Sequence, residues 1–260
     1  ALTSGEVDVD RMDYLLRDSY YTGVKYGTFD HAWLLGHLAY HEGEDGNVHL
    51  AIEDRALYTF DDFLLSRYHM FLMVYFHYKV VCYDRMLRRF YDEYPGLIAV
   101  PSDPEKFLLY DDAAINNILS EHAHDSVWAY GITNVRPLEL IAERWPHSQE
   151  DPVEAVRDRL TAHGIDHLTV TSKGALSKYG GRADSARTIY VRIQPRVGAS
   201  RFITLGEATK LFERYAEAAL LERVYVHAED AELAGSWVQE LRAASTGSNT
   251  AADTRSNENA

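Results

Sequence analysis

The sequence predicts a mostly α-helical protein with a β-hairpin insertion and a small α/β lobe toward its C-terminus. Two segments, residues 8–21 and 60–91, carry apolar residues at helical spacing. Between them, "HLAYHEGEDGNVHLAIED" (37–54) alternates on both sides of Asp45-Gly46, a typical hairpin turn. From residue 152 onward, short strand patterns alternate with helical patterns, which is typical of an α/β lobe.

The further elements follow from the same periodicities. The long helix is expected to end before "EYPG", where proline and glycine stop a helix. Additional helices are predicted at 111–120, 137–143, 152–163 and 206–220, and strands at "HLTVTS", "TIYVRIQPRV" and "RVYVHA". A last helix is predicted after "RVYVHA", ending at about 244. These elements predict a helical domain over 1–147 and an α/β appendage over 148–244. The polar stretch 245–260 is expected to be disordered.

Composition limits the classes of partner. The chain has 260 residues, of which 46% are hydrophobic, so a sizeable core is possible. Its formal net charge of −14 argues against a nucleic-acid polymer as partner. A small anionic ligand held by a local group of Arg and Lys remains compatible with that charge.

Targeting features point to the cytoplasm. No apolar run is long enough to cross a bilayer, and "ALTSGEVDVD" lacks the basic and apolar regions of a signal peptide. Cys82 is the only cysteine, so an intrachain disulfide is impossible and a reducing compartment is expected. We therefore expect a cytoplasmic protein without a membrane partner.

The first helix carries an unusual charged face. At 100° per residue, Asp10, Arg11, Tyr14 and Asp18 fall within an arc of roughly 100°. Carboxylates can hold a cation, while arginine and tyrosine donate hydrogen bonds to phosphate oxygens. The alternative is an amphipathic surface helix with a solvated charged side.

Two further groups of residues could bind anions. Arg67, Phe71, Tyr75 and Tyr78 share one face of the long helix, where Arg67 is either a phosphate ligand or an arginine extending from a packed helix to solvent. In "TSKGALSKYGGR", Lys173, Lys178 and Arg182 form a basic cluster among glycines. The alternatives for this cluster are an anion site and a flexible, solvated loop.

These motifs resemble a known family. "DVDRMDYLLRDSYYTGVKYGTFD", the hairpin and "SRYHMFLMVYFHYKV" together resemble the HD-domain phosphohydrolases, and within them the dNTP triphosphohydrolase-like group. The resemblance is close over residues 5–79, looser to about 143, and faint in the α/β lobe. It implies metal-dependent hydrolysis of a dNTP to nucleoside and triphosphate, with Mg, Mn, Fe or Zn as the metal.

The resemblance also implies roles for individual residues. Asp10 matches a metal ligand of the family, and Arg11 and Tyr14 match residues at the phosphates. Asp18 matches an acid that faces the deoxyribose hydroxyl. Arg67 matches a phosphate-binding arginine and Tyr75 a tyrosine that packs on the sugar. The chain departs from the family pattern at Phe71 and Phe76.

The family's remaining metal ligands, a histidine and a His-Asp pair, precede this helix. Only nine residues precede Asp10 here, and none is histidine. His124-Asp125 is a literal His-Asp pair but follows Asp10, so we do not expect it to bind metal. Three hypotheses follow: a companion chain supplies the ligands, the chain is a piece of a longer protein, or it is a non-catalytic nucleotide-binding or structural and regulatory subunit. A homo-oligomer or a companion chain is the expected assembly.

Overall fold

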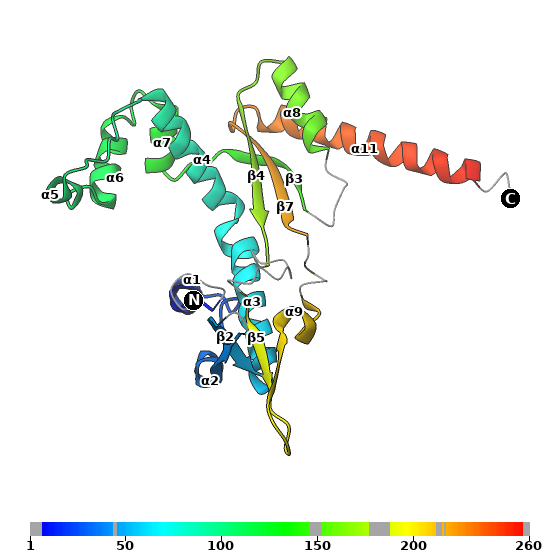
Figure 1. Cartoon of the computed structure of the whole chain (residues 1–260). Coiled ribbons are helices and arrows are strands. Elements are labelled where there is room, and N and C mark those ends of the chain that lie inside the picture. The colour runs from blue at the N-terminus through cyan, green and yellow to red at the C-terminus, as the bar shows by residue number, and fades with distance from the viewer. Residues whose placement is uncertain are drawn as a thin grey trace. The chain divides into compact units, whose positions relative to one another are not determined.

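The computed structural model describes residues 7–43, 46–145, 152–176, 188–211, 215 and 217–256. The chain divides into two compact units (Figure 1): unit 1 contains Ala1–Tyr75 and Lys173–Ala219, and unit 2 contains Phe76–Ser172 and Leu220–Ala260. Each unit draws on two separate stretches of sequence. The boundary near residue 147 that the sequence predicts is therefore not a boundary of either unit.

The helices of unit 1 are short. They are α1 (Val9–Thr22), α2 (His31–Gly36), a 3-10 turn (Asp54–Ala56), α3 (Leu57–Met70), a π-helical turn (Phe71–Tyr75) and α9 (Leu205–Ala208). Helix α1 begins where the Asp8 carboxylate accepts a 3.0 Å hydrogen bond from the Asp10 backbone N–H. It ends at Gly23, whose φ of +73° is the left-handed conformation that glycine adopts without strain. The helix predicted at 8–21 is thus confirmed.

A four-stranded sheet completes unit 1. Its strands are β1 (Leu38–Glu42), β2 (Val48–Glu53), β5 (Tyr190–Ile193) and β6 (Arg201–Thr204), in the order β1-β2-β5-β6. The hairpin is confirmed, because β1 and β2 pair antiparallel and Gly46 has a φ of +75°; Asp45, the other predicted turn residue, lies outside the described residues. It is not a separate insertion, however, because β2 also pairs in parallel with β5 from the predicted α/β lobe. The hairpin and part of that lobe therefore form one sheet.

The core of unit 1 lies between this sheet and the helices. Ile52 of β2 and Val191 of β5 pack with Leu15 of α1 and Phe60 of α3, all of them almost fully buried. Val48, at the turn end of the same strand, is 69% exposed. Burial of these apolar side chains fixes α1 and α3 against the sheet, and so positions their charged faces.

The single helix predicted at 60–91 is wrong. After α3 and the π-helical turn, Phe76 and His77 leave the helix, and α4 begins at Tyr78. In unit 2, the carbonyl of Phe76 accepts a 2.6 Å hydrogen bond from Arg223 and that of Tyr78 a 2.9 Å bond from Tyr225. These partners satisfy backbone carbonyls at the break and thereby offset the lost helical hydrogen bonds.

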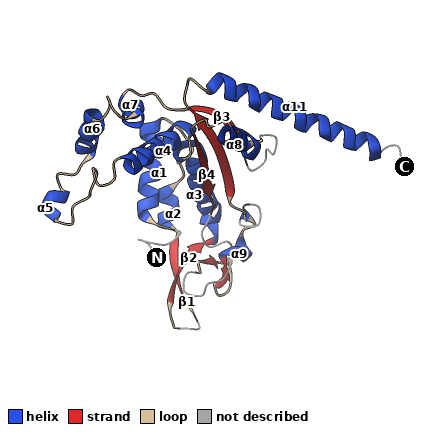
Figure 2. Cartoon of the chain, turned by 90° about the horizontal axis from the view of Figure 1, so that it is seen from above, coloured by secondary structure: helices blue, strands red, loops and turns tan. Residues whose placement is uncertain are grey.

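Unit 2 combines helices with a three-stranded sheet (Figure 2). The helices are α4 (Tyr78–Glu93), α5 (Pro104–Phe107), α6 (Asp112–Glu121), α7 (Val127–Thr133), α8 (Val153–Ala162) and α11 (Ala231–Ser256). The sheet has the order β3-β7-β4, with β3 at Glu139–Arg144, β7 at Ala219–Val226 and β4 at His167–Gly174. The architecture of the chain is accordingly mixed, with substantial helix and two small sheets.

Several elements that the sequence predicts after residue 110 differ from those in the structure. Residues 137–143 were expected to be helical, but 139–144 form β3, which pairs antiparallel with β7. A continuous helix at 206–220 is also wrong, because α9 ends at Ala208, Thr209 and Lys210 are not helical, and β7 begins at Ala219; residues 212–214 and 216 lie outside the described residues. Helix α11 continues to Ser256, through residues for which disorder was expected. The predicted helices at 111–120 and 152–163 are confirmed by α6 and α8.

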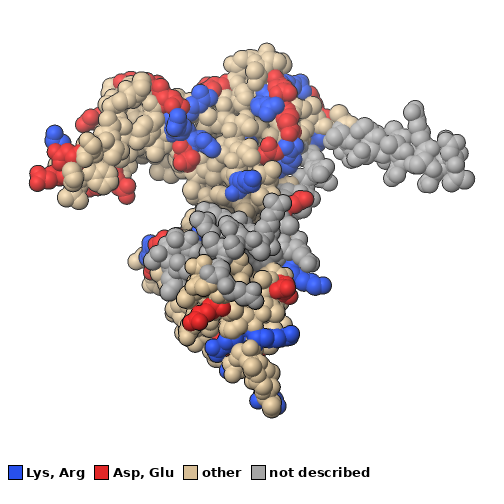
Figure 3. Space-filling model, viewed as in Figure 1, with Lys and Arg blue, Asp and Glu red and all other residues tan. Residues whose placement is uncertain are grey.

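Two properties of the surface bear on function. On the face drawn in Figure 3, acidic and basic side chains are interspersed, and acidic ones gather near α5. Within the described part of the chain, none of the helices has the length and apolar character needed to cross a membrane.

Candidate anion-binding site

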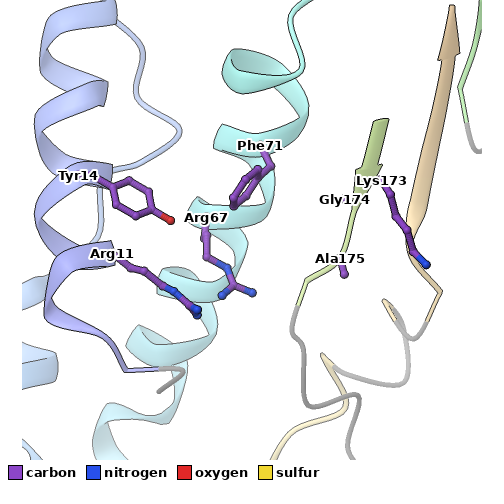
Figure 4. A pocket seen from close by; sticks show the side chains of 7 residues that line it. All are labelled: Arg11, Tyr14, Arg67, Phe71, Lys173, Gly174 and Ala175. Atoms are coloured by element: carbon purple, nitrogen blue, oxygen red, sulfur yellow. The ribbon is translucent and has the colours of Figure 1, made fainter. Parts of the chain in front are cut away.

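A pocket in unit 1 brings together three segments that are distant in sequence (Figure 4). Its volume is about 390 Å³. Helix α1 contributes Arg11 and Tyr14, and α3 with its π-helical turn contributes Arg67 and Phe71. The third wall is the end of β4 and the residue after it, namely Lys173, Gly174 and Ala175. All seven lining residues belong to unit 1.

Arg67 is the most deeply placed cation of the pocket. The residue is only 4% exposed, so Arg67 does not extend to bulk solvent. A guanidinium N–H donates a hydrogen bond to the backbone carbonyl of Leu176, 109 residues away in sequence. This bond orients the guanidinium, and burial reduces the screening of its charge by water.

Arg11 extends from α1 toward the guanidinium of Arg67 (Figure 4). Its Nε lies 3.9 Å from the carboxylate of Asp8. Asp8 is itself 7% exposed and also caps α1, so one carboxylate holds both the helix start and this arginine. Two arginines that line the same pocket offer paired N–H donors and positive charge, which suit an anionic ligand. The sequence alone did not single out Asp8; its position before an apolar helical pattern is the signal for such a cap.

Tyr14 adds a neutral hydrogen-bond donor. Burial raises the pKa of its phenol above the ordinary value, although Arg67 and Arg11 act in the opposite direction. The phenol is therefore protonated at neutral pH and can donate its O–H. Its ring meets that of Tyr75 edge to face, with centroids 6.2 Å apart.

Asp18 and Tyr75 form a neighbouring pair. The Tyr75 phenol donates a 2.7 Å hydrogen bond to the Asp18 carboxylate. Burial, and then this bond, raise the pKa of Tyr75 well above its usual range. Neither residue lines the pocket, but the ring of Tyr75 packs on Phe71, which does, with centroids 5.2 Å apart.

Asp10 lies apart from the pocket lining. Asp10 lies in the first turn of α1 and is exposed. Within the described ranges, no group of three or more His, Cys, Asp or Glu residues is arranged to hold a metal ion. A single exposed aspartate does not fit a catalytic metal by itself, since such sites take three or more protein ligands. The role of Asp10 as a metal ligand stays a prediction.

Two other sequence features have different outcomes. In unit 2, the Nε2 atom of His124 lies 4.0 Å from the Oδ2 atom of Asp125. The two side chains are 80% and 50% exposed, so the pair is a solvated surface contact. Of the basic cluster in "TSKGALSKYGGR", Lys173 lines the pocket, whereas Lys178 and Arg182 lie outside the described residues. The sequence pattern singled out Lys173 but carries no signal that it lines one pocket with residues of α1 and α3.

Comparison with known sequences gives partial matches. No family model matches the chain. It is 42% identical over 77 residues to the uncharacterized protein YwfO of Bacillus subtilis, covering 30% of this chain and 17% of that protein. It is 40% identical over 88 residues to the uncharacterized protein MJ1154 of Methanocaldococcus jannaschii, covering 34% and 19%. The matched region thus spans less than a fifth of the length of these relatives.

Comparison with solved structures covers most of the fold. A hypothetical protein from Aquifex aeolicus matches with a TM-score of 0.69 and 25% identity, over 90% of this chain and 57% of that one. A phosphohydrolase from Bacteroides thetaiotaomicron matches with a TM-score of 0.59 and 22% identity, over 87% and 62%. The chain therefore shares its fold with a solved phosphohydrolase.

Proposed function

We propose that this chain binds the phosphate groups of a nucleotide, and that it is a component of an HD-type, metal-dependent phosphohydrolase acting on dNTPs. The observation that carries the proposal is the convergence of Arg11, Tyr14 and buried Arg67 around one pocket. The likeness in fold to a phosphohydrolase supports it. So does the sequence resemblance, which assigns phosphate contacts to the same three residues.

The donors suit a phosphoryl group. Arginine presents planar, paired N–H groups that match two phosphate oxygens, and its charge persists at any physiological pH. Arg11 and Arg67 come from different helices, so they approach a phosphate from two directions. Tyr14 supplies a third donor without additional charge. These three donors would hold the phosphate in a defined orientation. Positioning of this kind is the main contribution that binding residues make to phosphoryl transfer.

The sugar and the metal complete the proposal. Asp18 and Tyr75, joined by their hydrogen bond and adjacent to Phe71, form the surface on which the deoxyribose would pack. The described residues do not build a metal site, so we assign the remaining ligands of Mg, Mn, Fe or Zn to another segment or a companion chain that acts with Asp10. Assembly as a homo-oligomer or with that companion belongs to the same proposal.

Binding of dATP tests the phosphate site. We expect the purified chain to bind dATP in calorimetric titration, and Arg67→Gln to weaken binding about 10- to 100-fold for a lost charge-assisted contact. Arg11→Gln should also weaken dATP binding. Because Arg11 is not fully buried, this variant should keep the fold. Arg85→Gln, at an exposed arginine of α4, is the control and should bind like the wild type. Equal affinities of the Arg67 and Arg85 variants would contradict the proposal.

Hydrolysis tests the assembly. The purified chain should release no triphosphate from dNTPs with Mg²⁺ or Mn²⁺, and release should appear when a polypeptide with the H…HD pattern is added. Turnover by the chain alone would show the companion hypothesis to be wrong. Binding of dATP without turnover in any assembly would favour the second candidate, a non-catalytic nucleotide-binding subunit, which the exposed position of Asp10 also supports.

A further inference from the structure

The third wall of the pocket is formed by the end of β4. Along this strand, burial alternates, so that Lys173 is exposed and the next residue, Gly174, is buried. Ala175 follows in the same wall. Because glycine and alanine carry little or no side chain, this wall leaves room for a ligand between β4 and the two helices.

The cations of the pocket stand in two separate places. In Figure 4, the side chains of Arg11 and Arg67 extend from their helices into the space on the helical side of the pocket. Lys173 lies on the opposite wall, and its ammonium points away from both arginines. The ammonium of Lys173 thus faces a different part of the pocket from the two guanidinium groups.

We propose that Lys173 binds a second phosphate of the same ligand, so that the pocket is selective for a chain of linked phosphates over a single phosphate. The inference rests on the proposed function, because it requires that Arg11 and Arg67 hold a first phosphate. It adds a residue from the α/β part of the sequence, where the family resemblance is faint.

The chemistry of the two kinds of cation agrees with this division. The buried arginine, fixed by the carbonyl of Leu176, suits one phosphate in one orientation. Lysine carries a compact charge on a flexible stem with rotatable donors, which suits a phosphate on the solvent side of a pocket. The gain in binding affinity that Lys173 provides should therefore increase with the number of phosphates in the ligand.

Inorganic anions test the inference without nucleotide chemistry. Orthophosphate, pyrophosphate and tripolyphosphate are titrated calorimetrically at low ionic strength into the wild type, Lys173→Gln and Lys25→Gln. Lys25 is an exposed lysine of unit 1 outside the pocket, so its variant removes the same charge elsewhere. We expect Lys173→Gln to weaken tripolyphosphate binding roughly three- to tenfold and orthophosphate binding less than twofold. Lys25→Gln should change neither by more than twofold, and Lys173→Arg should retain most of the tripolyphosphate affinity.

The outcomes separate this inference from the proposed function. If Arg67→Gln weakens binding of all three anions but Lys173→Gln weakens none, Lys173 is not a ligand and the phosphate pocket stands. If Lys173→Gln weakens all three anions equally, or no more than Lys25→Gln does, the assignment of a second phosphate to Lys173 is wrong. If the folded wild type binds none of the anions, the inference and the phosphate pocket fall together.

Discussion

The phenol of Tyr75 donates a 2.7 Å hydrogen bond to the carboxylate of Asp18, across 57 positions of sequence. It joins α1 to the π-helical turn that follows α3. These two segments carry Arg11 and Phe71, which both line the pocket. A π-helical turn is rare and often accompanies a functional site, because it turns side chains away from the register of an ordinary helix. Here it brings Tyr75 to Asp18.

The first prediction concerns this pair. Tyr75→Phe and Asp18→Asn should each lower the free energy of unfolding by about 1–2 kcal/mol, because each weakens a half-buried hydrogen bond to a charged group. The double variant should lose about 1 kcal/mol less than the sum, because both changes remove the same interaction. Urea unfolding followed by circular dichroism measures these values. Tyr20→Phe, at a residue that is 81% exposed, is the control and should stay within about 0.5 kcal/mol of wild type. Additive losses would show that the bond does not contribute.

The second prediction is the pH dependence of the same phenol. The pKa of Tyr75 is raised in the folded protein, chiefly by burial and then by Asp18. Its contribution to stability is therefore complete below the unfolded value of about 10 and is lost as pH rises toward the folded pKa. The stability difference between wild type and Tyr75→Phe should be constant from pH 7 to 9 and shrink above about pH 10. Absorbance at 295 nm should place Tyr75 among the last tyrosines to ionise, and a phenol that ionises with Tyr20 would contradict this.

The third prediction tests the loop that follows α1. A Cβ at Gly27 would overlap the Leu15 carbonyl and the Ser19 hydroxyl, and Ser19 accepts a 2.8 Å hydrogen bond from the Gly27 N–H. Gly27→Ala should therefore destabilise the protein by about 1–3 kcal/mol. Gly36→Ala is a matched control, because a Cβ there meets no atom within 4 Å. The measurement is the urea midpoint, and equal midpoints for the two variants would show that the close approach at Gly27 is not constraining.

The fourth prediction addresses the break between α3 and α4. Arg223 is 2% exposed and donates 2.6 Å hydrogen bonds to the Glu143 carboxylate and the Phe76 carbonyl. Arg223→Met should cost about 3 kcal/mol, because it leaves a carboxylate and a backbone carbonyl without this donor. Arg85→Met, at an exposed arginine, should cost less than about 0.5 kcal/mol. Amide hydrogen exchange at the start of α4 should accelerate in the Arg223 variant alone, and unchanged exchange there would contradict the account of the break.

Elements with local signals were predictable from the sequence. The hairpin followed from alternating apolar residues around a turn that contains Gly46, and α1 from helical spacing. The charged face of α1 followed from the same periodicity. These features depend on interactions within a few residues, which a sequence pattern records directly.

Partners distant in the chain decided the rest. Residues 139–144 form β3 because they pair with β7. The helical pattern at 60–91 is interrupted near Phe76, where Arg223 donates to the Phe76 carbonyl and Tyr225 to that of Tyr78. The pocket likewise depends on the carbonyl of Leu176, which meets Arg67 across 109 positions. Backbone hydrogen-bonding groups are the same in every residue, so a sequence does not record which distant donor or acceptor will satisfy them. The sequence therefore determined which helix faces carry the candidate ligands, and only packing in three dimensions decided which of those ligands share one pocket.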